Sequence, residues 1–261
     1  MSKKNETKEE KGDSTSLMAI DFHAFAGDGF ENVTANDVSI HFLKMLQKMS
    51  PEVDKTQPEY IKDAEQGDII NTLTKEVYKN GIKVIPCNFR KESIEWVLQE
   101  KGGGLKGIHS GDTPLWDTVT VDEKGRSILP NGNQLAATAN HYVLYKDHSN
   151  EWQSAIISLS GTQLKKSKQW LGRIAQIKLV GPNGKFTPPM FSKFWILKSV
   201  GESNDKGSWM GWDITPDSFI EDKELFDLGM RFYETIKSSP RLSNSMTEVK
   251  QITSSTIDEA I

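Results

Sequence analysis

The chain has 261 residues and a formal net charge of -4, with 36% hydrophobic and 26% charged residues. That length allows one large domain or two small ones with a buried core. No apolar run approaches the roughly 20 residues of a membrane-spanning helix, so no membrane association is predicted. The single cysteine, Cys87, cannot form a disulfide within the chain, which is typical of a reducing cytoplasm.

The two ends of the chain differ in composition from the rest. Residues 1–16 are mostly Lys, Glu, Ser and Thr, so they carry too little apolar surface to offset the entropy of ordering. They also lack the apolar segment of a secretory signal. We predict a disordered tail at 1–16, one domain at 17–239 and a flexible acidic tail at 240–261.

The first predicted element of the domain is a helix at 34–50. Thr34 fits an N-cap, and Pro51 follows the last residue of the segment. Apolar residues recur at helical spacing on one face, which predicts that this face packs in the core: Val38, Phe42, Leu46 and Met49.

Strand signals begin at residue 67. The tripeptide "KNG" at 79–81 separates two β-rich runs, which predicts a hairpin over 67–89. Residues 83–98 indicate one long strand with an irregularity near Pro86. The glycine-rich segment 101–112 is expected to be a flexible loop.

The remaining elements alternate between strands and helices. In chain order they are strands at 140–146 and 152–161, a helix at 162–179, an irregular loop at 180–190, strands at 191–200 and 208–214, and a second amphipathic helix at 216–239. A helix between the third and fourth of five strands is the plan of the OB barrel. We expect an α+β fold: a β-rich OB-like barrel core with an inserted helix and flanking N- and C-terminal helices. A different β-rich α+β sheet is an equal alternative.

Charge is segregated along the chain. From Trp152 to Val200 there is no Asp or Glu, and this window carries a formal charge of +8, which leaves -12 for the rest. A solvated helix face usually mixes both signs. The segregation therefore favours a basic surface that contacts a polyanion.

Aromatic residues are interleaved with these cations, as single-strand binding requires, because cations follow phosphates and rings stack on bases. Strand alternation assigns one face to the core, so about half of the rings remain for a ligand. The predicted nucleic-acid-binding residues are Lys165, Lys166, Lys168, Trp170, Arg173, Lys178, Lys193, Trp195, Lys198, Trp209 and Trp212, with Arg90 and Trp96 as secondary candidates.

No catalytic or cofactor site is predicted. The loop "KGGGLKG" lacks the Gly-Lys-Ser/Thr ending of a phosphate-binding loop. The acids at 122–123 and 248 have no partner acid that could complete a magnesium site. The five histidines are scattered, and none has a second His or a Cys at zinc-ligand spacing. The protein is therefore predicted to be non-catalytic, with neither a cofactor nor a metal.

Four stretches carry a resemblance to a known family: "ENVTANDVSIHFLKMLQKMSPEV", "GDIINTLTKEVY", "GTQLKKSKQW" and "GKFTPPMFSKFWILKSVGESNDKGSWMGWDI". Over about residues 18–235 the chain resembles a family of tailed-bacteriophage proteins that are described as single-stranded-DNA-binding proteins. The resemblance implies single-stranded DNA as partner, a role in DNA replication or recombination, and a location in the host cytoplasm.

The chain departs from single-strand binders that end in a densely acidic tail, because it ends only in "IDEAI". Recruitment of phage replication or recombination proteins through this tail is an open expectation, and so is a homo-oligomer. Two alternatives remain for the function: a structural or assembly protein of the virion, and a recombination mediator that anneals strands.

Overall fold

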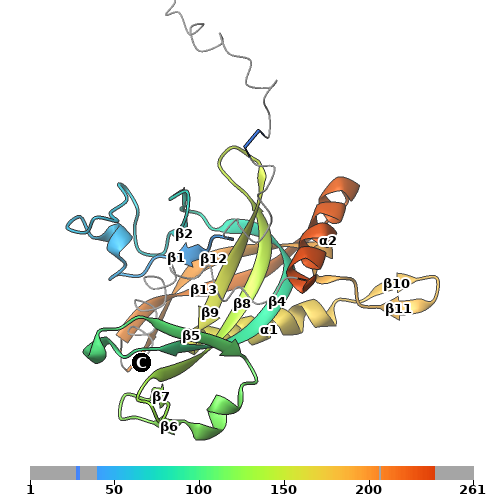
Figure 1. The fold of residues 1–261 in the computed structure, drawn as a ribbon. Helices are drawn as coiled ribbons and strands as arrows, with labels where there is room; N and C mark the ends of the chain where they lie inside the picture. The colour runs from blue at the N-terminus through green and yellow to red at the C-terminus, as the bar shows by residue number, and fades with distance from the viewer. Residues whose placement is uncertain (1–27, 30–39, 206, 239–261) are drawn as a thin grey trace, which may run out of the picture. The chain divides into compact units, whose positions relative to one another are not determined.

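A computed structural model describes residues 28–29, 40–205 and 207–238 (Figure 1). The chain divides into two compact units, Met1–Val38 and Ser39–Ile261, and the boundary falls inside the single domain predicted at 17–239. Both predicted tails lie outside the described residues. All the elements described below belong to the second unit.

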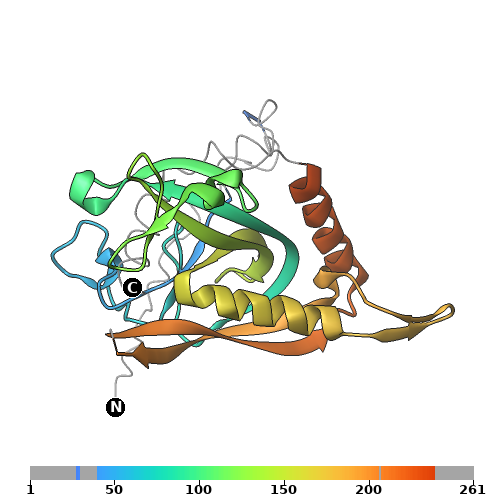
Figure 2. The same ribbon diagram turned by 90° about the horizontal axis from the view of Figure 1, so that it is seen from below.

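An antiparallel sheet of eight strands dominates this unit and curls into a half-barrel (Figures 1 and 2). Its path is β13-β12-β4-β8-β7-β6, while β5 pairs with β4 and β9 pairs with β8. The strands are β4 (Ile82–Trp96), β5 (Leu105–Ser110), β6 (Thr120–Val121), β7 (Ser127–Ile128), β8 (Gln134–Lys146), β9 (Trp152–Ser160), β12 (Lys193–Asn204) and β13 (Gly207–Phe219).

The long strand β4 bends at a β-bulge. The register against β8 shifts between Pro86 and Asn88, so Cys87 has no partner residue. An extra residue reverses which side chains face which side of a sheet. Accordingly, Ile85 packs on one face with Cys87, whereas Phe89 packs on the other face. This confirms the irregularity predicted near Pro86.

Two helices cover opposite faces of the sheet. The helix α1 (Leu164–Gln176) contacts β8, β9 and β13 and lies on the concave side, as Figure 2 shows. On the other face α2 (Lys223–Ser238) packs against β4, with Leu225 buried beside Ile85 and Cys87. The inserted helix and the C-terminal helix are therefore confirmed, with shorter bounds than predicted.

The predicted helix at 34–50 is wrong over its described part. Residues 43–45 form β1 (Leu43–Met45), which pairs with β2 (Ile69–Asn71), and β2 pairs in turn with β3 (Val77–Tyr78). The apolar residues of this segment fit both a helical and a strand period. Tertiary contacts decide, because all three β1 residues are buried and Lys44 reaches Glu52 at 3.2 Å inside the protein.

Three other local predictions are corrected. The turn at 79–81 forms no hairpin, because β3 pairs with β2, whereas β4 pairs with β12 and β8. Part of the predicted loop at 101–112 is strand β5. The predicted loop at 180–190 contains a hairpin of β10 (Leu179–Gly181) and β11 (Gly184–Phe186).

Short 3-10 helices complete the unit. They are η3 (Pro51–Val53), η4 (Gln99–Lys101), η5 (Pro114–Thr118), η6 (Gly161–Gln163) and η7 (Met190–Ser192). The result is a mixed α/β unit that is dominated by strands, with α1 and α2 as the α-helices of its described part.

Candidate nucleic-acid interface

The acid-free window from 152 to 200 folds into β9, α1, the β10–β11 hairpin and most of β12. On α1, helical periodicity turns Ser167, Trp170 and Ile174 inward, because residues three and four apart share a face. Lys165 and Lys168 point to solvent on the other side. Neither forms an ion pair with any residue that the structure describes.

The next exposed cations lie at the end of α1, after it and on the hairpin that follows. Arg173 is exposed, and its guanidinium also donates to the carbonyl of Ile214 on β13. Lys178 donates to the hydroxyl of Thr187 at the base of the hairpin, and Lys185 is exposed on β11. The hairpin projects from the sheet in line with α1 (Figure 2). We call Lys165, Lys168, Arg173, Lys178 and Lys185 the basic strip.

Lys166 is not part of this strip, because its charge is balanced. Its Nζ lies 2.7 Å from Oε1 of Glu202. Burial raises the pKa of Glu202, but hydrogen bonds from Lys166, Gln163 and Trp209 outweigh it, so the pKa lies below its usual range. Trp209 is half-buried and donates its indole N–H to Glu202 at 3.0 Å. Nucleic-acid binding by Trp209 stays a prediction. The residue lies next to the Glu202 carboxylate, which would repel a phosphate.

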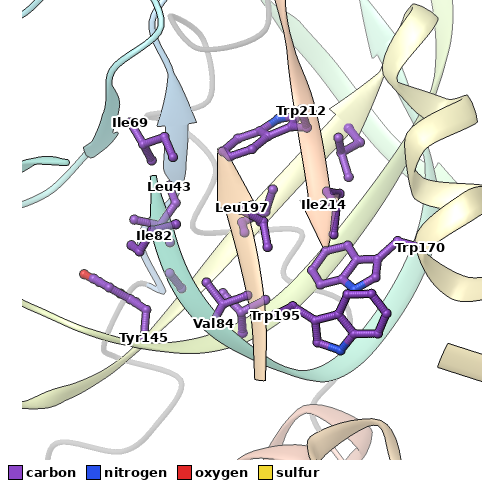
Figure 3. Packing of buried hydrophobic residues seen from close by; sticks show 14 of the residues in the cluster. Leu43, Ile69, Ile82, Val84, Tyr145, Trp170, Trp195, Leu197, Trp212 and Ile214 are labelled. Carbon is purple, nitrogen blue, oxygen red and sulfur yellow. The ribbon is translucent and has the colours of Figure 1, made fainter. Parts of the chain in front are cut away.

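Four predicted interface tryptophans lie in the core. Trp170 and Trp195 are each 1% exposed, and Trp212 and Trp96 are each 5% exposed. Figure 3 shows three of them packed among Leu197, Ile214 and other apolar side chains. The prediction that these rings face a ligand is therefore wrong. Trp170, Trp195 and Trp212 share one core cluster inside the curled sheet, and Trp96 is buried in a second cluster.

Trp170 and Trp195 also contact each other, with ring centroids 6.1 Å apart in an edge-to-face arrangement. Neither indole N–H has a hydrogen-bond acceptor among the residues that the structure describes. In Figure 3 the indole nitrogen of Trp170 points toward the Trp195 ring. Packing against the other apolar side chains of the core fixes both rings.

The predicted groove between α1 and β12 is split by the sheet. Trp195 and Leu197 face the core that α1 covers, while Lys198 is exposed on the other face of β12, opposite Asp213 of β13. Lys193 places its Nζ 4.2 Å from the centroid of the Phe219 ring. Lys198 therefore faces away from the core side that α1 covers.

The secondary candidate Arg90 has a structural partner. Its guanidinium donates to the carbonyl of Ile236 on α2 and lies 5.8 Å from the centroid of the Tyr142 ring. This contact ties α2 to the sheet. The other secondary candidate, Trp96, belongs to the same region of the core as Tyr142 and Ile236.

A group of residues that the prediction missed lies on the face of the sheet opposite α1. Trp152 of β9 and Phe194 of β12 have ring centroids 6.1 Å apart at an interplanar angle of 21°. Lys146 and Lys83 accompany them, with Nζ 5.3 Å from the Trp152 ring and 4.4 Å from the Phe194 ring, respectively. We call these four residues the Trp152–Phe194 cluster. Their positions in strands far apart in sequence gave no local signal.

The described part of the chain contains no group of three or more His, Cys, Asp or Glu side chains placed to hold a metal ion. Among the helices of that part, none has the length and apolar character needed to cross a membrane.

The fold and surface define a strand-dominated α/β protein with a basic strip on one helix and one projecting hairpin. Residues 9–241 match the family model of the Pam3 phage gp34-like proteins, and the chain belongs to this family. It is therefore a phage protein. Comparisons with curated proteins and with solved structures gave no match.

Proposed function

We propose that this phage protein binds single-stranded DNA without catalysis, in DNA replication or recombination in the host cytoplasm, and that the basic strip contacts the phosphates. The observation that carries the proposal is the exposure of Lys165 and Lys168 in a window without acids. Their charges are not balanced by a described carboxylate, so bound phosphates would displace no ion pair of the described residues.

The curled sheet supports the proposal as a scaffold. A helix follows β9 and precedes β12, so a curled antiparallel sheet carries an inserted helix, as in an OB barrel. In our interpretation the sheet is OB-like and rigid, and it holds the strip in a fixed geometry.

The strip sets the expected salt dependence. If all five of its cations contact phosphates, the log–log slope of affinity against salt is about -3.5, at roughly -0.7 for each phosphate of a single strand. Affinity would then fall by about 100-fold between 50 and 200 mM salt. Fewer contacts give a proportionally smaller slope.

The test is fluorescence anisotropy of a labelled oligo-dT of about 30 nucleotides, titrated with protein at several salt concentrations. The double variant Lys165→Glu/Lys168→Glu should bind at least ten-fold more weakly and show a flatter slope. The matched control is Lys55→Glu/Lys62→Glu, which makes the same charge change at two exposed residues of the loop between β1 and β2. Absence of binding by the natural protein at micromolar concentration would refute the proposal, and equal weakening of both variants would refute the role of the strip.

A second function is favoured by one observation. Val180 is 80% exposed and Phe186 is 47% exposed on the β10–β11 hairpin, and exposed apolar groups on a projecting element fit a protein partner. This arrangement suits a structural or assembly protein of the virion. Association with other virion proteins, together with no binding to oligo-dT, would establish this alternative.

A further inference from the structure

Two aromatic rings meet on the sheet although their strands are not neighbours. In the sheet, β4 and β8 lie between β12, which carries Phe194, and β9, which carries Trp152. Three strand spacings of roughly 4.8 Å separate these backbones, yet the two ring centroids are only 6.1 Å apart. The rings therefore reach toward each other over β4 and β8.

The rings of Trp152 and Phe194 rest on the core. Both are partly buried and pack against the cluster of Ile85, Cys87 and Leu144. Each ring packs on the core but is only partly buried, so part of its surface is accessible to a ligand without a change in the fold.

Lysines from the two intervening strands flank the rings. Lys146 is the register partner of Trp152, and Lys83 is the register partner of Ile196, two residues from Phe194. Lys83 also forms an ion pair of 2.6 Å with Asp217, and its side chain is 47% exposed. Exposed pairs of this kind contribute little free energy, so a phosphate can compete for this ammonium group.

The other half-buried tryptophans are held differently. Trp116 donates its indole N–H to Ser93 at 2.8 Å, and Trp209 donates to the carboxylate of Glu202 at 3.0 Å. Of the seven tryptophans, Trp152 alone combines partial exposure with a second near-parallel ring and a lysine at cation–π distance.

We propose, on the basis of the proposed function, that Trp152 and Phe194 form a stacking platform for the bases of single-stranded nucleic acid, with Lys83 and Lys146 contacting the neighbouring phosphates. Every base has a flat π-face, so such a platform binds without sequence preference. It supplies the stacking surface that the buried tryptophans of the core cannot supply.

The first experiment is intrinsic tryptophan fluorescence, excited at 295 nm, during titration with unlabelled oligo-dT of about 30 nucleotides. The natural protein should be quenched, and Trp152→Phe should lose most of that quenching. The matched control Trp116→Phe should keep it. Because phenylalanine retains an aromatic ring at each position, both variants should fold.

The second experiment separates stacking from charge. Trp152→Ala should weaken binding of labelled oligo-dT by about 5- to 150-fold and leave the salt slope unchanged, because stacking releases no counterions. Lys165→Glu/Lys168→Glu should instead flatten the slope.

Each outcome decides between the two proposals. If oligo-dT binds by anisotropy but Trp152→Phe is quenched like the natural protein, the platform is refuted and the proposed function stands. If the natural protein does not bind oligo-dT at all, both are refuted. The Trp152→Phe result holds even if Trp152→Ala does not fold.

Discussion

A histidine in the core should make the stability of this protein depend on pH. His141 of β8 is fully buried, stacks on Trp170 with centroids 4.4 Å apart, and places Nε2 at 2.8 Å from the hydroxyl of Ser167. Its Nδ1 has no hydrogen-bond partner within the described part of the chain. A protonated ring would therefore be a charge in an apolar site with one unsatisfied N–H.

The magnitude follows from the pKa of this ring. Burial lowers the pKa of His141 from 6.5 to about 3. The unfolded chain then binds a proton below pH 6.5 that the folded chain does not take up until about pH 3, so stability is full above pH 6.5 and falls as the pH decreases toward 3. At about 1.4 kcal/mol for each pH unit, this group alone should cost about 2 kcal/mol between pH 7 and pH 5.

The perturbation that isolates this effect is His141→Phe, which keeps a ring against Trp170 and removes the titrating group. Ser167 can then donate to the carbonyl of the preceding helical turn. We would measure the free energy of unfolding by urea at several pH values from 5 to 7.5. The variant should lose about 2 kcal/mol less than the natural protein on going from pH 7 to pH 5. Identical pH dependence of the two proteins would refute the reasoning.

Three further predictions concern the stability of the fold, and each is checked by urea or thermal unfolding. Trp195→Ala should lower the free energy of unfolding by about 3–5 kcal/mol, because it leaves a cavity in the core. A loss below about 1 kcal/mol would contradict the burial of the Trp195 ring. Gly81→Ala should lower the free energy of unfolding more than Gly125→Ala does. Both glycines have positive φ (+88° and +82°), but their surroundings differ. A Cβ at Gly81 would lie 2.5 Å from a backbone carbonyl oxygen, whereas a Cβ at Gly125 would meet no described atom within 4 Å. Equal costs of about 1–2 kcal/mol would indicate that only the backbone conformation matters. Lys44→Met should lower the free energy of unfolding by about 3–5 kcal/mol, because it leaves the buried carboxylate of Glu52 without the Lys44 ammonium group. Adding Glu52→Leu should restore most of the lost stability. A double variant as unstable as the single one would show that the ion pair is not the cause.

Local pattern predicted most of the later elements of the chain. Alternating and helical periods indicated β8, β9, α1, β12, β13 and α2, although β8 begins at Gln134 and not at 140, and α2 begins at Lys223 and not at 216. The same reasoning failed at residues 43–45, because Leu43, Met45 and Leu46 satisfy a helical and a strand pattern equally well. Pairing with β2 and the buried Lys44–Glu52 contact decide this segment, and neither can be inferred from a short window.

The sequence by itself determined the segregation of charge, because the absence of Asp and Glu from 152 to 200 holds in any fold. It also determined that α1 would present Lys165 and Lys168 on one face, since helical periodicity is local. Only the tertiary structure decided which aromatic rings are accessible. Trp170 and Trp195 are enclosed in the core of the curled sheet, and the rings of Trp152 and Phe194 meet although their strands are separated in the sheet. Burial depends on what packs above each residue, and that is a property of the whole chain.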